Sequence, residues 1–132
     1  MPIHKKYYIL FPHGDQDVRL IVFPELSLCG YTCQDLLYEN ILMDSMEEAI
    51  FKICQENTSD AIIVIGCALR QYNHLYNCAV FIHQHSILGI VPKTYLPNYN
   101  EFYEKRWFQV QIPVLMMISI YMDSAFLFPP GF

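Results

Sequence analysis

The chain has 132 residues, with 8 basic and 13 acidic side chains, a formal charge of −5 at neutral pH and a hydrophobic fraction of 54 %. This length suits one domain, and this hydrophobic fraction excludes an intrinsically disordered chain. The acidic balance argues against nucleic-acid binding, and apolar runs shorter than the ~18 residues of a membrane span argue against a membrane partner.

The first predicted elements lie between residues 20 and 54. Leu20 to Phe23 is a short β-branched and aromatic run closed by Pro24, which predicts a buried strand ending in a loop. Ser45 with Glu48 three residues later forms a capping-box pattern and predicts the start of a helix. Apolar residues then recur at helical spacing through residue 54, so we expect this helix to pack on a sheet.

The next elements predict strands of mixed direction. Residues 61–68 are almost wholly apolar and predict a central strand covered on both faces. Residues 77–83 and 86–91 flank Gln84 and His85, which predicts a β-hairpin with a short turn. A strand, a helix, a further strand and a hairpin together predict an α/β fold with a mixed sheet.

Two charged residues follow predicted strands. Glu25 comes directly after the strand that ends at Phe23, and Lys93 follows the second strand of the hairpin. Ligands often bind at the carboxyl ends of strands, where Glu25 would serve as a general base and Lys93 would stabilise an oxyanion, with Glu101 orienting the lysine. In the alternative interpretation Glu25 is a solvated loop residue, and the charges near Lys93 lie on the surface between aromatic anchors.

Two segments carry a family resemblance. The sequence FPELSLCGY at residues 23–31 and the sequence PKTYLPNYNEFYEKRWF at residues 92–108 occur together in this chain. Both resemble the nitrilase (carbon–nitrogen hydrolase) superfamily, and within it the glutaminase domain of glutamine-dependent NAD synthetases. The resemblance covers roughly residues 20–108 and implies part of an αββα sandwich.

The resemblance also implies roles for three residues. Glu25 matches the family's general base, which takes the proton of a cysteine thiol. Lys93 matches the lysine that stabilises the tetrahedral intermediate, and Glu101 matches an additional glutamate near that lysine. Amide hydrolysis through a thioester needs a thiolate, a proton acceptor and a cation near the developing negative charge.

The nucleophile that the family requires has no match in this chain. The family's cysteine follows the lysine by several tens of residues, whereas the last of the five cysteines here is Cys78. We therefore expect no nucleophile, a catalytically incomplete enzyme and reduced thiols in a cytoplasmic protein. Cys29 and Cys33 make a poor metal site without further ligands, so we expect no metal.

The two ends of the chain depart from the family pattern. Residues 1–19 show no clean period, and residues 109–132 form an apolar tail of no helical or strand period. We expect three parts: an aberrant segment 1–19, a partial carbon–nitrogen hydrolase domain 20–108 and an aberrant tail 109–132. A mis-framed start and an out-of-frame tail joined to a genuine central fragment would explain this pattern.

The resemblance makes a fragment of a glutaminase domain the leading functional hypothesis. In the intact family enzyme this domain hydrolyses glutamine and supplies ammonia for NAD synthesis, with ATP and Mg²⁺ used by the synthetase domain. The resemblance implies that the protein oligomerises through the nitrilase domain. No glycine-rich phosphate loop is found in this sequence, so we expect no cofactor on these residues. The alternatives are a stand-alone amidase of the same superfamily and a non-catalytic interaction module.

Overall fold

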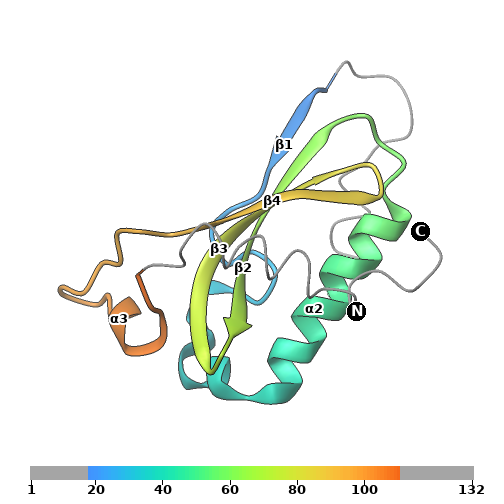
Figure 1. The fold of residues 1–132 in the computed structure, drawn as a ribbon. Helices are drawn as coiled ribbons and strands as arrows, with labels where there is room; N and C mark the ends of the chain where they lie inside the picture. The colour runs from blue at the N-terminus through green and yellow to red at the C-terminus, as the bar shows by residue number, and fades with distance from the viewer. Residues whose placement is uncertain (1–17, 111–132) are drawn as a thin grey trace.

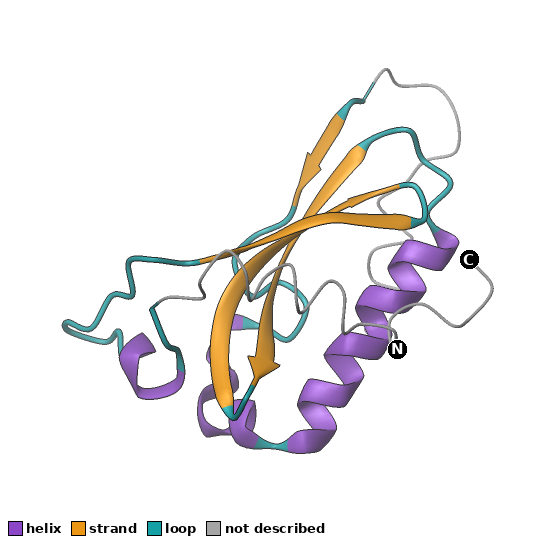
Figure 2. Ribbon diagram, in the orientation of Figure 1, coloured by secondary structure: helices purple, strands orange, loops and turns teal. Residues whose placement is uncertain are grey.

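The structure is a computed structural model that describes residues 18–110. The described residues form a four-stranded sheet in the order β1-β2-β3-β4, with a long helix packed against it (Figures 1 and 2). The strands are β1 (Leu20–Val22), β2 (Ile62–Gln71), β3 (His74–His83) and β4 (Ser86–Pro92). The helices are the 3₁₀ helix η1 (Tyr31–Tyr38), α2 (Asn40–Glu56) and α3 (Glu104–Trp107).

The sheet is mixed, as the sequence predicts. β1 is parallel to β2, whereas the β2–β3 and β3–β4 pairs are antiparallel. The predicted hairpin around Gln84 and His85 is confirmed as β3 and β4. The polar break before it is a second tight turn, in which Tyr72 and Asn73 adopt positive φ angles of 46° and 66°. β3 therefore begins at His74, three residues earlier than predicted.

Strand β1 is less buried than its apolar sequence predicts. Its side chains Leu20 and Val22 are 58 % and 65 % exposed. The reason is its place at the edge of the described sheet, where it pairs with β2 alone. The prediction of a strand was correct here, and the prediction that it is buried was wrong.

Helix α2 begins earlier than the capping pattern predicts. Its N-terminal cap is Glu39, which makes no side-chain capping bond, and Ser45 lies inside the helix with its Oγ donating to the Ile41 carbonyl oxygen at 2.6 Å. A serine within a helix commonly bonds back to the carbonyl four residues earlier. The predicted start at Ser45 was therefore wrong, although the predicted apolar face is the one that the helix buries.

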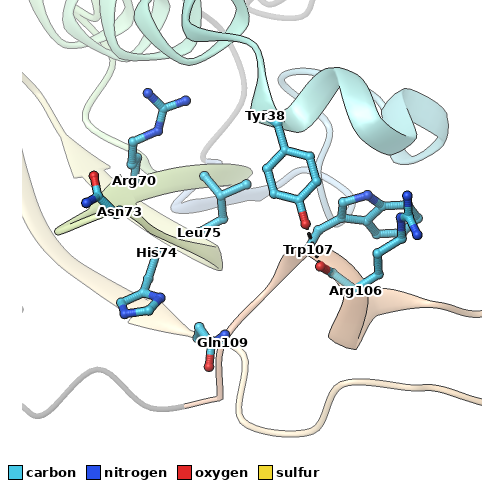
Figure 3. A pocket seen from close by; sticks show the side chains of 8 residues that line it. All are labelled: Tyr38, Arg70, Asn73, His74, Leu75, Arg106, Trp107 and Gln109. Atoms are coloured by element: carbon cyan, nitrogen blue, oxygen red, sulfur yellow. Dashed lines mark hydrogen bonds between the residues drawn. The ribbon is translucent and has the colours of Figure 1, made fainter.

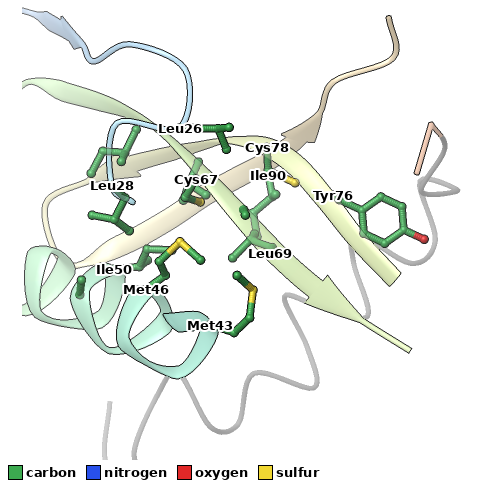
Figure 4. Packing of buried hydrophobic residues seen from close by; sticks show 14 of the residues in the cluster. Leu26, Leu28, Met43, Met46, Ile50, Cys67, Leu69, Tyr76, Cys78 and Ile90 are labelled. Atoms are coloured by element: carbon green, nitrogen blue, oxygen red, sulfur yellow. The ribbon is translucent and has the colours of Figure 1, made fainter. Parts of the chain in front are cut away.

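The core lies between α2 and one face of the sheet. Figure 4 shows Met43, Met46 and Ile50 of α2 directed toward Cys67 and Leu69 of β2. Successive side chains of a strand alternate between the two faces of a sheet. Gly66 precedes Cys67, and Ala68 lies between Cys67 and Leu69. Positions 66 and 68 therefore face the side of the sheet away from α2.

Several predictions concern residues outside the described range. Most of segment 1–19 and of the tail 109–132 lies outside it, so the proposed domain boundaries stay predictions. Within residues 18–110, no helix has the length and apolar character that crossing a bilayer requires.

Candidate active site

Gly66 of β2 positions the turn that carries Glu25. A Cβ atom at Gly66 would lie 2.5 Å from the Pro24 carbonyl oxygen, 2.6 Å from the Leu26 nitrogen and 2.8 Å from the Glu25 Cα. A side chain at position 66 would thus occupy the space of the turn. Leu28 then donates its N–H to the Gly66 carbonyl oxygen at 3.1 Å, which fixes the far end of the turn on β2.

Lys93 reaches the same place from the end of β4. Its backbone N–H donates to the Asn77 carbonyl oxygen of β3 at 2.7 Å, directly after the last β4 residue. Its side-chain Nζ donates to Glu25 Oε1 at 2.8 Å. The structure therefore brings together Glu25 and Lys93, which are 68 residues apart in sequence.

The carboxylate beside Lys93 from the following segment is that of Glu104. Lys93 Nζ donates to Glu104 Oε1 at 3.0 Å, and Tyr31 donates its hydroxyl to the same oxygen at 2.6 Å. Glu104 is only 2 % exposed, and its second oxygen is buried without a hydrogen-bond partner in the described structure. Glu101, which the sequence predicts beside the lysine, is exposed and is not brought to Lys93.

Asn77 is a second site residue that the sequence analysis missed. Its Nδ2 donates to Glu25 Oε1 at 2.6 Å, and the side chain is buried within β3. Asn77 pairs with Ala68 across the ladder, so both side chains lie on the face over which the Glu25 turn passes. One signal was available: Asn77 is a polar residue inside a long apolar strand.

The charges of the cluster favour a protonated lysine. Partial burial alone would lower the pKa of Lys93, but the hydrogen bonds and charges of Glu25 and Glu104 outweigh it and raise that pKa. Burial and the hydrogen bond to Glu104 also raise the pKa of the Tyr31 phenol. Lys93 therefore stays a cation at neutral pH between two carboxyl groups, and Tyr31 stays a hydrogen-bond donor.

All five cysteines lie in the described residues, and none hydrogen-bonds with the cluster around Lys93. Burial is the main cause that raises the pKa of Cys29, Cys54 and Cys78 to about 12, and burial also raises the pKa of Cys67. A thiolate is the nucleophilic form of cysteine, so these four side chains are held in the unreactive form. In residues 18–110, no three histidine, cysteine or acidic side chains are grouped as metal ligands.

A hollow of about 380 Å³ lies elsewhere on the molecule (Figure 3). Its rim includes Arg106, whose guanidinium forms a two-pronged ion pair with Asp35 at 2.9 and 3.0 Å. Neither Glu25 nor Lys93 lines it, so it is separate from the candidate active site. The lining residues are Tyr38, Arg70, Asn73, His74, Leu75, Arg106, Trp107 and Gln109.

Comparison with known proteins shows the family to which this fold belongs. The carbon-nitrogen hydrolase family matches residues 11–117, and the chain belongs to this family. Among curated proteins, the chain is 44 % identical over 93 residues to the glutamine-dependent NAD(+) synthetase of Mycobacterium tuberculosis. The aligned residues make up 70 % of this chain and 14 % of that protein.

Solved structures show the same relationship. The glutamine-dependent NAD(+) synthetase of Cytophaga hutchinsonii superposes with a TM-score of 0.69 at 25 % identity, covering 86 % of this chain and 18 % of that one. The enzyme of Acinetobacter baumannii, solved with ADP, gives a TM-score of 0.67 at 32 % identity, covering 83 % and 20 %. These neighbours confirm the predicted α/β fold, and this chain spans a fifth or less of the length of these relatives.

Proposed function

We propose that this chain is a segment of a glutaminase domain like that of glutamine-dependent NAD synthetases, and that Glu25 and Lys93 are two of its catalytic residues. The observation that carries the proposal is the 2.8 Å contact between Lys93 Nζ and Glu25 Oε1. It joins a carboxylate and an ammonium from two separate loops on one face of the sheet. The similarity to glutamine-dependent enzymes supports glutamine as the substrate.

The two groups suit the two charge changes of amide hydrolysis. A thiol sulfur attacks the amide carbonyl carbon and gives its proton to Glu25, which passes a proton on to the leaving ammonia. Negative charge develops on the carbonyl oxygen, where the Lys93 ammonium stabilises it. Water then cleaves the thioester to glutamate and regenerates the thiol. The Glu25 and Lys93 side chains are 39 % and 27 % exposed, which leaves both within reach of a substrate.

We propose that the nucleophilic thiol of this reaction is not one of the five cysteines of this chain. Burial raises the pKa of four of these thiols, and the thiols of Cys29 and Cys33 donate to backbone carbonyl oxygens of residues 26, 29 and 30. We therefore propose that the 132-residue chain does not hydrolyse glutamine by itself. The proposal assigns no cofactor to these residues and leaves ATP and Mg²⁺ to a synthetase domain, in a cytoplasmic enzyme.

An ammonia-release assay on the purified chain tests both parts of the proposal. Without an added nucleophile, we expect no more ammonia from glutamine than the Lys93→Ala variant releases. With a small thiol such as 2-mercaptoethanol as external nucleophile, we expect release that Glu25→Gln and Lys93→Ala each reduce at least about tenfold. The exposed residues Glu39 and Lys105 provide matched control variants, Glu39→Gln and Lys105→Ala.

The two arms of this assay fail in different ways. Turnover without added thiol, above that of Lys93→Ala, would show that the chain holds its own nucleophile. Thiol-dependent release that is equal in the chain and in both site variants would contradict the assignment of Glu25 and Lys93.

A further inference from the structure

Asn77 contacts both proposed catalytic residues. Its side-chain Nδ2 donates to Glu25 Oε1 at 2.6 Å, and its backbone oxygen accepts the Lys93 N–H at 2.7 Å. Glu25 lies on the loop after β1, and Lys93 lies on the loop after β4. Their side chains bond directly to each other, and both residues also bond to Asn77. One residue of the central strand β3 therefore holds both loops at the site.

The burial of Asn77 is unlike that of an ordinary core residue. Its side chain is 3 % exposed, and an amide buried without a partner destabilises a protein, so the hydrogen bond to Glu25 is needed to satisfy it. Glu25 itself is 39 % exposed and can be hydrated by solvent. An apolar side chain at position 77 would thus leave no unpaired polar group buried there. Glu25 would lose its bond to residue 77 and could turn toward solvent.

The direction of the contact selects one oxygen of Glu25. Both Asn77 Nδ2 and Lys93 Nζ donate to Oε1, and neither donates to Oε2. A carboxylate oxygen has two lone pairs, so these two bonds occupy Oε1 and leave Oε2 to accept a proton. An amide suits this task because its N–H groups donate at every pH at which the protein is folded.

We infer that Asn77 is a positioning residue of the site, which holds Glu25 through Oε1 and keeps Oε2 available as the proton-accepting oxygen. This inference rests on the proposed function of Glu25 as a general base. A general base must be held within hydrogen-bond distance of its proton, and a misplacement of about 1 Å can reduce a rate about a hundredfold. Asn77 itself exchanges no proton and touches no reacting atom.

The first test is the side-chain amide signal of Asn77 in ¹⁵N NMR spectra of the chain. We expect its two proton shifts to change in Glu25→Gln and to stay unchanged in Glu39→Gln. Asn77 signals that are the same in the chain and in Glu25→Gln would overturn the inference, whatever the catalytic result.

The second test compares Asn77→Leu with Asn57→Leu in the thiol-dependent ammonia assay. Asn57 is also a buried asparagine, with an Nδ2 bond of 3.3 Å to the Gln84 carbonyl oxygen, but it lies away from the site. We expect Asn77→Leu to lose about tenfold or more in rate and to change its dependence on pH, while Asn57→Leu keeps both. Equal rates and pH profiles in the two variants would overturn the inference.

The two tests also separate this inference from the proposed function. A chain without any Glu25-dependent rate would contradict the proposed function, and the Asn77 amide signal would still decide whether Asn77 holds Glu25. A Glu25-dependent rate that Asn77→Leu leaves intact would contradict the inference alone.

Discussion

The close approach of the Glu25 turn to Gly66 makes Gly66→Ala an informative substitution. The added Cβ would come within 2.5 to 2.8 Å of three backbone atoms of residues 24–26. Backbone atoms cannot move aside as a flexible side chain does, so the whole turn must shift. Gly89→Ala is the matched control, because a Cβ atom at Gly89 of β4 meets nothing within 4 Å.

The expected loss of stability follows from two contacts. Overpacking of this kind destabilises a protein by about 1 to 3 kcal/mol, and loss of the Leu28 N–H bond to the Gly66 carbonyl oxygen adds about 1 kcal/mol. The reduced freedom of the unfolded chain offsets about 0.5 kcal/mol in both alanine variants. This offset is common to both variants, so we expect Gly66→Ala to lower the free energy of unfolding by about 2 to 4 kcal/mol relative to Gly89→Ala.

Urea unfolding followed by circular dichroism measures this difference. With a slope of about 1 to 2 kcal/mol per molar urea, the midpoint of Gly66→Ala should lie at least about 1 M below that of Gly89→Ala. Gly66→Ala should also weaken the effect of Glu25 on the Asn77 amide signal, because the turn no longer holds Glu25 in place. Equal midpoints in the two variants would refute the argument that the turn rests on the bare backbone of Gly66.

Three further predictions concern the charges and thiols. Glu104→Gln removes the charge of a buried partner of Lys93 and should lower the free energy of unfolding in urea by about 1 to 3 kcal/mol. Glu101→Gln should change that free energy by no more than about 0.5 kcal/mol. A larger loss in Glu101→Gln than in Glu104→Gln would instead support Glu101 as the residue that supports Lys93. The pKa of Lys93 is raised above its ordinary value of 10.5. The charge of Lys93 therefore stabilises the fold below pH 10.5, and this stabilisation is lost as the pH rises through the pKa of Lys93 in the folded protein. Lys93→Met should accordingly lose less stability in alkali than the unsubstituted chain loses. Cys29 and Cys78 should react slowly with iodoacetamide at pH 7 and at the rate of a free cysteine in denaturant, and fast labelling of both in the folded chain would contradict their raised pKa values.

The sequence predicts the layout of this fold better than the details of its site. The apolar face of α2 follows from a period of 3.6, and the central strand and the hairpin follow from short apolar runs separated by polar turns. The exposure of β1 does not follow, because its short apolar run is compatible with both a central and an edge position. Whether a strand lies at an edge depends on its neighbours, which local pattern does not encode.

The site shows the same limit at the scale of single residues. Strand ends and family motifs bring Glu25 and Lys93 together, and the structure places them 2.8 Å apart. The carboxylate beside Lys93 is Glu104 and not Glu101 because the loop after β4 turns into α3 and buries the first residue of that helix. The role of Asn77 depends on the cross-strand register, which fixes the face of the sheet that each side chain shares.

Beyond the bond between Glu25 and Lys93, several hydrogen bonds join the segment after β1 to the segment after β4. Tyr31 donates to Glu104 at 2.6 Å, and Asp35 accepts bonds at 2.9 Å from both the Arg106 guanidinium and the Trp107 indole. Trp107 is the chain's single tryptophan. Its fluorescence emission therefore reports on the contacts between these two segments. A red shift on mild heating would show that the two segments separate before the sheet unfolds.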